Sequence, residues 1–232
     1  MDVQLVGVTP NPERLPALAA KLTHSNTTTD KLEQSSDKEL QAILDQVMRM
    51  GHTSVVEHTS FTFAISEVSR SLTHQLVRHR IASYAQQSQR YVNLEKPCFI
   101  TPPKIAKNKE MKQAYEQVME TIWDQYNKLL DMKIPAEDAR YVLPNSTCTN
   151  IMVTMNARSL LNFFELRCCL HAQWEIRQLA NKMLKLVKKK APRIFKDAGP
   201  PCQSKGYCPE HNPDCPLYPK SDITYESTKN NS

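Results

Sequence analysis

The densest group of chemically capable side chains lies in the stretch RHRIASYAQQSQR, which runs from Arg78 to Arg90. It holds three arginines, a histidine and two serines, and no aspartate or glutamate occurs from Val68 to Leu94. Arginine is always charged, and its planar fork matches two oxygens of a phosphate or carboxylate. Several forks without nearby counter-ions repel one another, so the stretch predicts a site for an anion such as a nucleotide phosphate. A solvated basic surface is the alternative.

A glutamine just ahead of this stretch could contact a base. In the helix that we expect over residues 69–80, Gln75 lies three residues before Arg78 and four before His79, so the side chains share a face. An amide both donates and accepts hydrogen bonds, as the edge of a pyrimidine requires. The alternative is a glutamine that simply faces solvent.

Two further segments combine polar groups in patterns that could bind a ligand. The segment from Gly51 to His58 reads GHTSVVEH, but its spacing matches neither HExxH nor HxxEH, so we expect no metal there. Further along, Arg158 and Asn162 lie four residues apart on one face of an expected helix. Asn156 opens that helix, where free backbone N–H groups suit an anion. These polar residues could instead face water.

The last part of the chain differs in composition from the rest. From Ala198 onward it is rich in proline and short of large aliphatic residues, so we predict a catalytic domain over residues 1–198 and a Pro- and Cys-rich tail over residues 199–232. Truncation after Ala198 is expected to leave ligand binding and catalysis largely intact. The tail could be a flexible segment with reduced thiols, or a metal site formed by its potential soft ligands, Cys202, Cys208, His211 and Cys215.

The spacing of apolar residues predicts the elements that position these groups. A capping box at Ser36 and Glu39 indicates a helix start, and residues 83–90 are expected to form a loop or an irregular strand. The order of elements predicts an α+β fold, with a mixed or antiparallel sheet flanked by helices and one long helical segment. Strands are expected over residues 2–8, 61–65, 98–101 and 147–155, a loop over 24–36, and helices over 15–22, 37–50, 69–80, 107–132, 135–140, 156–170 and 173–190.

Composition limits the classes of protein to which the chain can belong. Its 232 residues suit one domain with a sizeable core plus an appendage. No apolar run approaches the length of a membrane span, and the first residues do not resemble a signal peptide, so we expect a cytoplasmic protein without a membrane partner. The net charge of +6 fits an anionic partner. The four glycines form no phosphate loop, so a nucleotide cofactor would be bound by side-chain cations and helix ends.

These motif blocks together resemble one enzyme family. The stretch from Arg78 to Arg90 is similar to RHRxxSxNxxSxR, the signature of the flavin-dependent thymidylate synthases. Ala85 replaces the asparagine of that signature, and Gln86 replaces the acidic residue that commonly follows it. The segments GHTSVVEH, NARSLLNFFELR and HAQWEIR resemble further parts of the family, so the resemblance extends from about residue 52 to residue 176. The signature positions that match are Arg78, His79, Arg80, Ser83, Ser88 and Arg90.

The resemblance implies a reaction, a cofactor and a set of site residues. Reduced FAD, recharged by NADPH, would work with methylene-tetrahydrofolate to methylate dUMP to dTMP, in a homotetramer with active sites between subunits. The catalytic residue implied is Arg167, which would stabilise charge developing on the uracil ring. The implied dUMP contacts are Gln75, Arg78, Gln86, Gln87, Ser88, Gln89, Arg90, Arg140 and Arg167. The implied FAD contacts are His52, Arg78, His79, Arg80, Gln86, Asn156, Arg158 and Asn162.

Two alternative functions remain open at this point. A nucleic-acid-binding protein could use the same basic residues, but they are concentrated in motif blocks and few aromatic residues accompany them, so no nucleic acid partner is expected. A flavin-binding relative with another substrate or transfer chemistry would fit the departures at Ala85 and Gln86. The sequence does not rank methyl against hydroxymethyl transfer, or NADPH against NADH.

Overall fold

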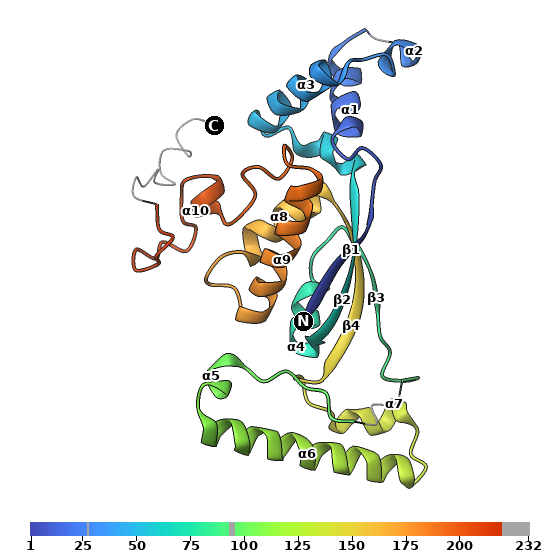
Figure 1. The fold of residues 1–232 in the computed structure, drawn as a ribbon, viewed down its shortest axis with the longest axis vertical. Helices are drawn as coiled ribbons and strands as arrows, with labels where there is room; N and C mark the ends of the chain where they lie inside the picture. The colour runs from blue at the N-terminus through green and yellow to red at the C-terminus, as the bar shows by residue number, and fades with distance from the viewer. Residues whose placement is uncertain (27, 93–95, 220–232) are drawn as a thin grey trace. The chain divides into compact units, whose positions relative to one another are not determined.

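The computed structural model describes residues 1–26, 28–92 and 96–219 (Figure 1). Its four strands form one antiparallel sheet in the order β1–β2–β4–β3. This confirms the α+β prediction, with antiparallel rather than mixed pairing. The strands are β1 (Asp2–Val8), β2 (Ser60–Ser69), β3 (Ala82–Gln86) and β4 (Cys148–Asn156).

Helices make up most of the remaining described chain. The main ones are α1 (Arg14–His24), α3 (Asp37–Arg49), α4 (Arg70–Leu76), α6 (Lys109–Asp131), α8 (Ala157–Arg167) and α9 (Trp174–Lys190). Short helices and 3-10 turns lie between them: α2 (Thr29–Leu32), η1 (Thr53–His58), α5 (Pro103–Ala106), α7 (Ala136–Ala139), η2 (Arg140–Val142) and α10 (Pro201–Ser204). Within the described residues, no helix is both long and apolar enough to cross a membrane.

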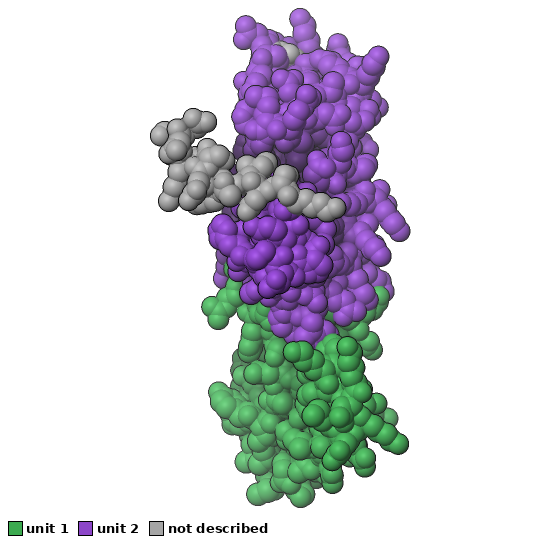
Figure 2. Space-filling view, turned by 90° about the vertical axis from the view of Figure 1, so that its left-hand side faces the viewer, with its two compact units in different colours: residues 1–2, 64–78, 84–153 green, residues 3–63, 79–83, 154–232 purple. Residues whose placement is uncertain are grey.

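The chain forms two compact units that alternate along the sequence (Figure 2). Unit 1 comprises residues 1–2, 64–78 and 84–153, and unit 2 comprises residues 3–63, 79–83 and 154 onward. The RHR triplet is therefore divided, with Arg78 in unit 1 and His79 and Arg80 in unit 2. The described part of the tail belongs to unit 2 rather than to a unit of its own.

Unit 2 is built around a cluster of buried phenylalanines. The ring of Phe195 lies 5.4 Å from Phe61 and 5.9 Å from Phe164, and Phe164 lies 5.7 Å from Phe163. All four side chains are fully buried. Offset and edge-on aromatic pairs of this kind add to the stabilisation from buried area, so the cluster fixes α8 against β2 and the segment that follows α9.

The long helix α6 packs in unit 1 through one apolar face. The fully or nearly fully buried residues of the helix are Met119, Trp123 and Tyr126, whereas the apolar Met111 and Val118 are more than half exposed. The ring of Trp123 lies 6.3 Å from Phe99. The strand expected over residues 98–101 is reduced to a single bridge between Phe99 and Thr147.

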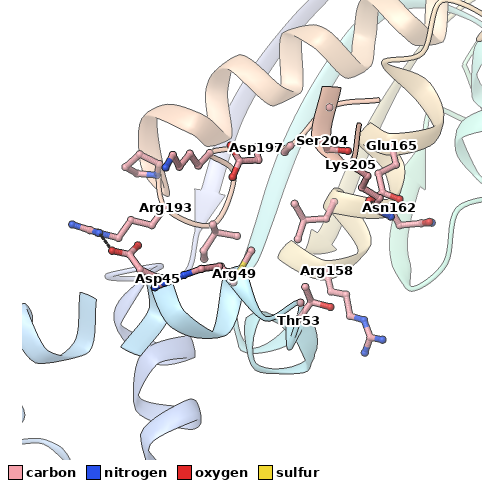
Figure 3. Close-up of a pocket in the computed structure, with 18 residues that line it drawn as sticks. Asp45, Arg49, Thr53, Arg158, Asn162, Glu165, Arg193, Asp197, Ser204 and Lys205 are labelled. Carbon is pink, nitrogen blue, oxygen red and sulfur yellow. Dashed lines mark hydrogen bonds and ion pairs between the residues drawn. The ribbon is translucent and has the colours of Figure 1, made fainter. Parts of the chain in front are cut away.

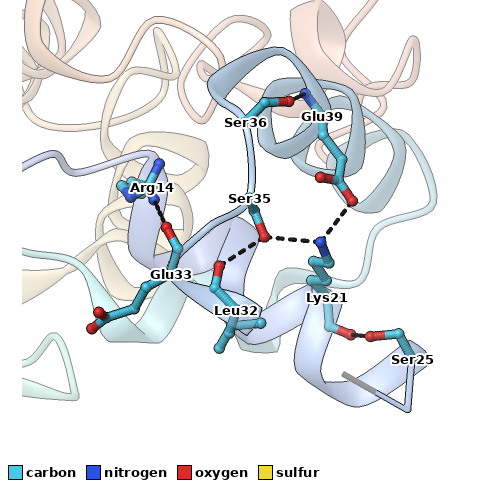
Figure 4. A network of polar contacts seen from close by, with 8 residues as sticks. All are labelled: Arg14, Lys21, Ser25, Leu32, Glu33, Ser35, Ser36 and Glu39. Atoms are coloured by element: carbon cyan, nitrogen blue, oxygen red, sulfur yellow. Dashed lines mark hydrogen bonds and ion pairs between the residues drawn. The ribbon is translucent and has the colours of Figure 1, made fainter. Parts of the chain in front are cut away.

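The start of α3 forms as predicted, within a wider polar network (Figure 4). The backbone N–H of Glu39 donates to Ser36 Oγ over 3.3 Å, and Lys21 Nζ contacts Ser35 Oγ at 2.8 Å and Glu39 Oε1 at 2.7 Å. These contacts connect Ser35 and Ser36, at the end of the predicted loop, to α1 and α3. One turn of that segment, α2, is helical, so the loop prediction over residues 24–36 is wrong there.

Candidate functional site

Three motif blocks that are distant in the sequence meet at α8 in unit 2. The backbone N–H of Ala157 donates to the carbonyl of Thr59 over 2.8 Å, and the N–H of Ile81 donates to Ser159 Oγ over 3.2 Å. Thr59 is fully buried and also donates its hydroxyl to the carbonyl of Pro12 over 2.7 Å. The segments that follow GHTSVVEH and RHR are thus held against the first turn of α8.

The side chain of Asn156 caps α8. Its Oδ1 accepts from the N–H of Ser159 over 2.8 Å, which is the usual satisfaction of a free donor in the first turn of a helix. The sequence predicted that Asn156 opens this helix, and that position is confirmed. The observed contact is structural, and the predicted FAD contact at Asn156 is untested.

Arg158 projects from the first turn of α8 and has an acidic partner in η1. Its Nη1 contacts Glu57 Oε1 at 2.5 Å, and both side chains are about half exposed. Glu57 thus reaches a residue 101 positions away in the sequence. His52, the implied flavin contact, is exposed just before η1.

His79 and Arg167 form a part-buried side-chain contact between two of these blocks. Arg167 Nε donates to His79 Nε2 over 2.9 Å, and the His79 ring lies edge-on to Phe163 at 4.9 Å. Burial, and secondarily the charge of Arg167, lower the pKa of His79 to about 4. The imidazole is therefore neutral near pH 7, as an acceptor from a guanidinium must be.

A cavity of about 1340 Å³ opens beside α8 within unit 2 (Figure 3). Arg158 and Asn162 line it from α8, and Thr53 lines it from η1. Figure 3 also shows Arg193, which lines another part of the cavity and forms an ion pair with Asp45. The volume exceeds the roughly 300–1,000 Å³ typical of small-molecule pockets, so it can accept a nucleotide-sized ligand.

The tail contributes to the same cavity. Gly199, Ser204 and Lys205 are among its lining residues, and Lys205 Nζ contacts Glu165 of α8 at 2.8 Å. Cys208 is buried. Composition did not predict this packing, because the tail residues that contact the rest of unit 2 are single residues separated by prolines.

The tail thiols lie near one another and near Cys169. Burial and the neighbouring thiols of Cys169, Cys208 and Cys215 raise the pKa of Cys202. Within residues 1–26, 28–92 and 96–219, no group of three or more His, Cys, Asp or Glu side chains is arranged to hold a metal ion. His211 instead belongs to a tail turn, its N–H bonded to the carbonyl of Cys208 over 3.2 Å.

In unit 1, two of the implied dUMP arginines converge on α7. Arg90 Nε and Nη2 each lie 2.9 Å from Glu137 Oε2, and Arg140 Nε donates to the Glu137 carbonyl over 2.9 Å. Burial, followed by the charge of Arg140, lowers the pKa of Arg70. The guanidinium of Arg70 therefore lies within electrostatic range of Arg140. Glu137 was missed from the sequence because its partner is 47 residues away.

The segment from Gln86 to Arg90 leaves strand β3 with several of its polar groups already used. Gln86 Nε2 contacts Thr73 Oγ1 at 3.0 Å and Thr149 Oγ1 at 3.3 Å, and Ser88 Oγ accepts from the N–H of Arg90 over 3.2 Å. The N–H of Gln87 donates to the carbonyl of Asn150 over 2.9 Å.

The side-chain amide of Gln89, in contrast, has an unused donor. Among the buried side-chain nitrogens and oxygens of the described residues, Gln89 Nε2 is the one that lacks a hydrogen-bond partner. Because an unpaired buried donor is costly, this group indicates a place for an acceptor that the chain itself does not supply.

The helix that carries Gln75 is shorter than expected. Helix α4 ends at Leu76, whose carbonyl accepts the hydroxyl of Tyr84 over 2.8 Å. Gln75 and His79 therefore do not share a helix face, and the predicted helix over residues 69–80 is wrong beyond Leu76. Arg78 and Arg80 are exposed in the turn and bend that follow.

Comparison with known proteins identifies the family. The family model described as thymidylate synthase complementing protein matches residues 4–193. The flavin-dependent thymidylate synthase of Geobacter sulfurreducens is 51% identical over 218 residues, which cover 93% of this chain and 94% of that protein. The enzyme of the same name from Clostridium tetani is 47% identical over 232 residues, with 93% of each chain covered.

A solved structure shares the fold as well. The UMP/dUMP methylase PolB from Streptomyces cacaoi, bound with 5-Br dUMP, matches with a TM-score of 0.72 and 25% sequence identity. The match covers 84% of this chain and 93% of that chain. Together with the convergence of the motif blocks on α8, these similarities show that the chain belongs to the flavin-dependent thymidylate synthases, the enzymes that use a flavin to methylate dUMP to dTMP.

Proposed function

We propose that unit 2 carries most of the flavin contacts of this thymidylate synthase and unit 1 carries most of its dUMP contacts. The observation that supports the flavin assignment is the cavity lined by Arg158 and Asn162, beside the first turn of α8. It is large, it is partly cationic, and it is adjacent to the motif blocks that resemble the family's FAD residues. The implied FAD contacts at Arg78, Gln86 and the remaining signature positions are part of the same proposal.

The residues present fit a dinucleotide cofactor without a glycine-rich loop. Arg80 is exposed and makes no hydrogen bond or ion pair with any described residue. Arg158 is about half exposed although its Nη1 pairs with Glu57. Both guanidinium groups can thus present N–H donors to phosphate oxygens. FAD, when bound, supplies the redox chemistry that side chains lack.

Arg167 is the residue we assign to polarising the uracil ring. Its Nε is committed to neutral His79, which leaves the two terminal nitrogens of the guanidinium for other acceptors. A fixed cation at a carbonyl of the ring would stabilise negative charge as it develops during transfer. His79 orients this cation in addition to its proposed flavin contact.

On the dUMP side, Arg90 and Arg140 are proposed to contact the phosphate, and Gln75, Gln87, Ser88 and Gln89 to complete the site. NADPH and methylene-tetrahydrofolate are the co-substrates of the family reaction. The departures at Ala85 and Gln86 keep a relative with altered transfer chemistry as the second candidate. We also propose a cytoplasmic homotetramer, as the family resemblance implies.

The experiment that tests the flavin assignment is replacement of Arg80 by alanine. Because Arg80 has no partner in the described chain, its removal is expected to preserve the fold and to reduce bound FAD by at least tenfold. FAD content after desalting, measured by absorbance, and dTMP formation from dUMP would be compared with wild type. Lys185→Ala, on an exposed part of α9, is the control. Stoichiometric FAD in Arg80→Ala would show that the cofactor is misplaced.

A further inference from the structure

Arg90, in the stretch without acidic residues, has a counter-ion in α7, which is the carboxylate of Glu137. A single oxygen, Glu137 Oε2, lies 2.9 Å from both Nε and Nη2 of Arg90. No other described carboxylate pairs with Arg90. The pair is about half exposed on both sides, so it contributes little to stability and exchanges readily with other anions.

The surroundings of Glu137 suit an anion stronger than one carboxylate. Arg140 Nε donates to the backbone carbonyl of Glu137, and the charge of Arg140 adds to burial in lowering the pKa of Arg70. Gln89, next to Arg90 in the chain, holds a buried Nε2 donor without an acceptor. The Glu137 carboxylate therefore pairs with Arg90 alone, while Arg140 lies on the backbone of the same residue and Gln89, the neighbour of Arg90 in the chain, has an unpaired donor.

A phosphate monoester matches this arrangement better than Glu137 does. It carries about 1.5 to 2 negative charges near pH 7 and three strong acceptor oxygens. It can engage the Arg90 fork and still leave oxygens for a second guanidinium or for the amide of Gln89. The carboxylate of Glu137 has one charge and already uses one oxygen for both Arg90 contacts.

We propose that Glu137 is an internal stand-in for the 5′-phosphate of dUMP: it occupies the Arg90 fork in the free protein, and the nucleotide phosphate displaces it. Glu137 thereby determines specificity, because a ligand without a phosphate gains nothing from displacing it. This inference rests on the proposed dUMP role of Arg90. The proposed function names only residues that bind the substrate. The present inference adds Glu137, a residue that competes with the substrate for Arg90.

The test is Glu137→Gln, which keeps the shape of the side chain and removes its charge. In the FAD-loaded protein at low ionic strength, calorimetry would give dissociation constants for dUMP, deoxyuridine and inorganic phosphate. We expect dUMP and phosphate to bind about two- to fivefold more tightly than in wild type, the range set by an exposed ion pair. Deoxyuridine affinity is expected to be unchanged.

Asp138→Asn is the matched control. Asp138 lies in the same turn, is exposed and has no side-chain partner in the described chain, so its change alters the same local charge without touching Arg90. An equal gain in this control would show a general field effect and overturn the proposal. Weaker or unchanged binding of dUMP and phosphate in Glu137→Gln would overturn it as well. If wild type bound no dUMP, the proposed function would fail, whereas competition for inorganic phosphate would still decide the role of Glu137.

Discussion

At the scale of single residues, the contact between His79 and Arg167 joins two positions that the sequence assigned to different ligands. An imidazole that accepts from a guanidinium has to be neutral, and its burial keeps it so. Protonation of His79 would remove the acceptor and place two cations side by side. The orientation of Arg167 therefore depends on the protonation state of a residue in another motif block.

This contact predicts a pH dependence of stability. The pKa of His79 is lowered from 6.5 to about 4 in the folded protein, so between these values the unfolded chain binds more protons. The free energy of unfolding should therefore fall as pH decreases from 6.5 towards 4, by up to about 3 kcal/mol. His79→Gln keeps an acceptor and cannot titrate. Between pH 7 and pH 4.5 it should lose roughly 2 kcal/mol less than wild type.

Urea unfolding at pH 7 and pH 4.5 would measure the difference. His58→Gln, at the exposed end of η1, is the control and should retain the wild-type loss. The same loss in His79→Gln as in wild type would show that His79 is not the group responsible.

The sequence predicted single residues where the motif is local and missed them where a partner is distant. The arginines and serines of the signature were evident from their spacing. Glu57 and Glu137 were not, because each meets its arginine only after the chain has folded over 101 and 47 residues. Arg90 lacks an acidic neighbour in the sequence, but in the folded chain it pairs with Glu137.

At the scale of elements, α8 depends on its cap, which gives a prediction at Asn156. Replacement by alanine removes the acceptor of the Ser159 N–H and should lower the free energy of unfolding by about 1 kcal/mol. It should also weaken FAD retention, because the first turn of α8 carries Arg158. Asn156→Ser should restore most of the stability, since serine also caps helices.

Asn108 offers a matched control for this change. It caps α6 in unit 1, where its side chain accepts from the N–H of Met111 over 3.0 Å. Asn108→Ala should lose similar stability, measured by thermal or urea unfolding, without altering FAD content. Equal FAD loss in the two variants would mean that destabilisation alone releases the cofactor.

Most elements could be predicted because their signals are local. The alternation of Phe61, Phe63 and Ile65 and the cap at Ser36 depend on neighbours in the sequence, and both were confirmed. The end of α4 was not predictable, because a contact from Tyr84 takes its last carbonyl. The buried face of α6 was only partly predictable, because Phe99 selects Trp123 from outside the helix.

At the scale of the whole molecule, the structure changes the result expected from shortening the chain. Truncation after Ala198 would remove Gly199, Ser204 and Lys205 from the cavity, together with the Lys205–Glu165 pair and buried Cys208. We now expect weaker FAD retention and a melting temperature lower by about 4–8 °C, the shift for a loss of about 2 kcal/mol in a chain of this size.

Truncation after Pro219 is the control, because it keeps every described tail contact. Differential scanning fluorimetry and FAD content would be measured for both shortened chains and the full one. If truncation after Ala198 behaved like the full chain, the tail would be dispensable, as its composition first suggested. The boundary between a domain over residues 1–198 and a tail over 199–232 would then have functional meaning.

The junction at the start of α8 has a consequence for how relatives of this protein vary. The bond from Ala157 to Thr59 joins two backbone atoms, so the side chains at these positions can change independently while the bond persists. Covariation among aligned sequences would therefore not reveal it. The Arg158–Glu57 pair next to it joins two charged side chains, and changes at one should be matched by changes at the other. Of the two contacts between these motif blocks, aligned sequences would therefore reveal the side-chain pair and not the backbone hydrogen bond.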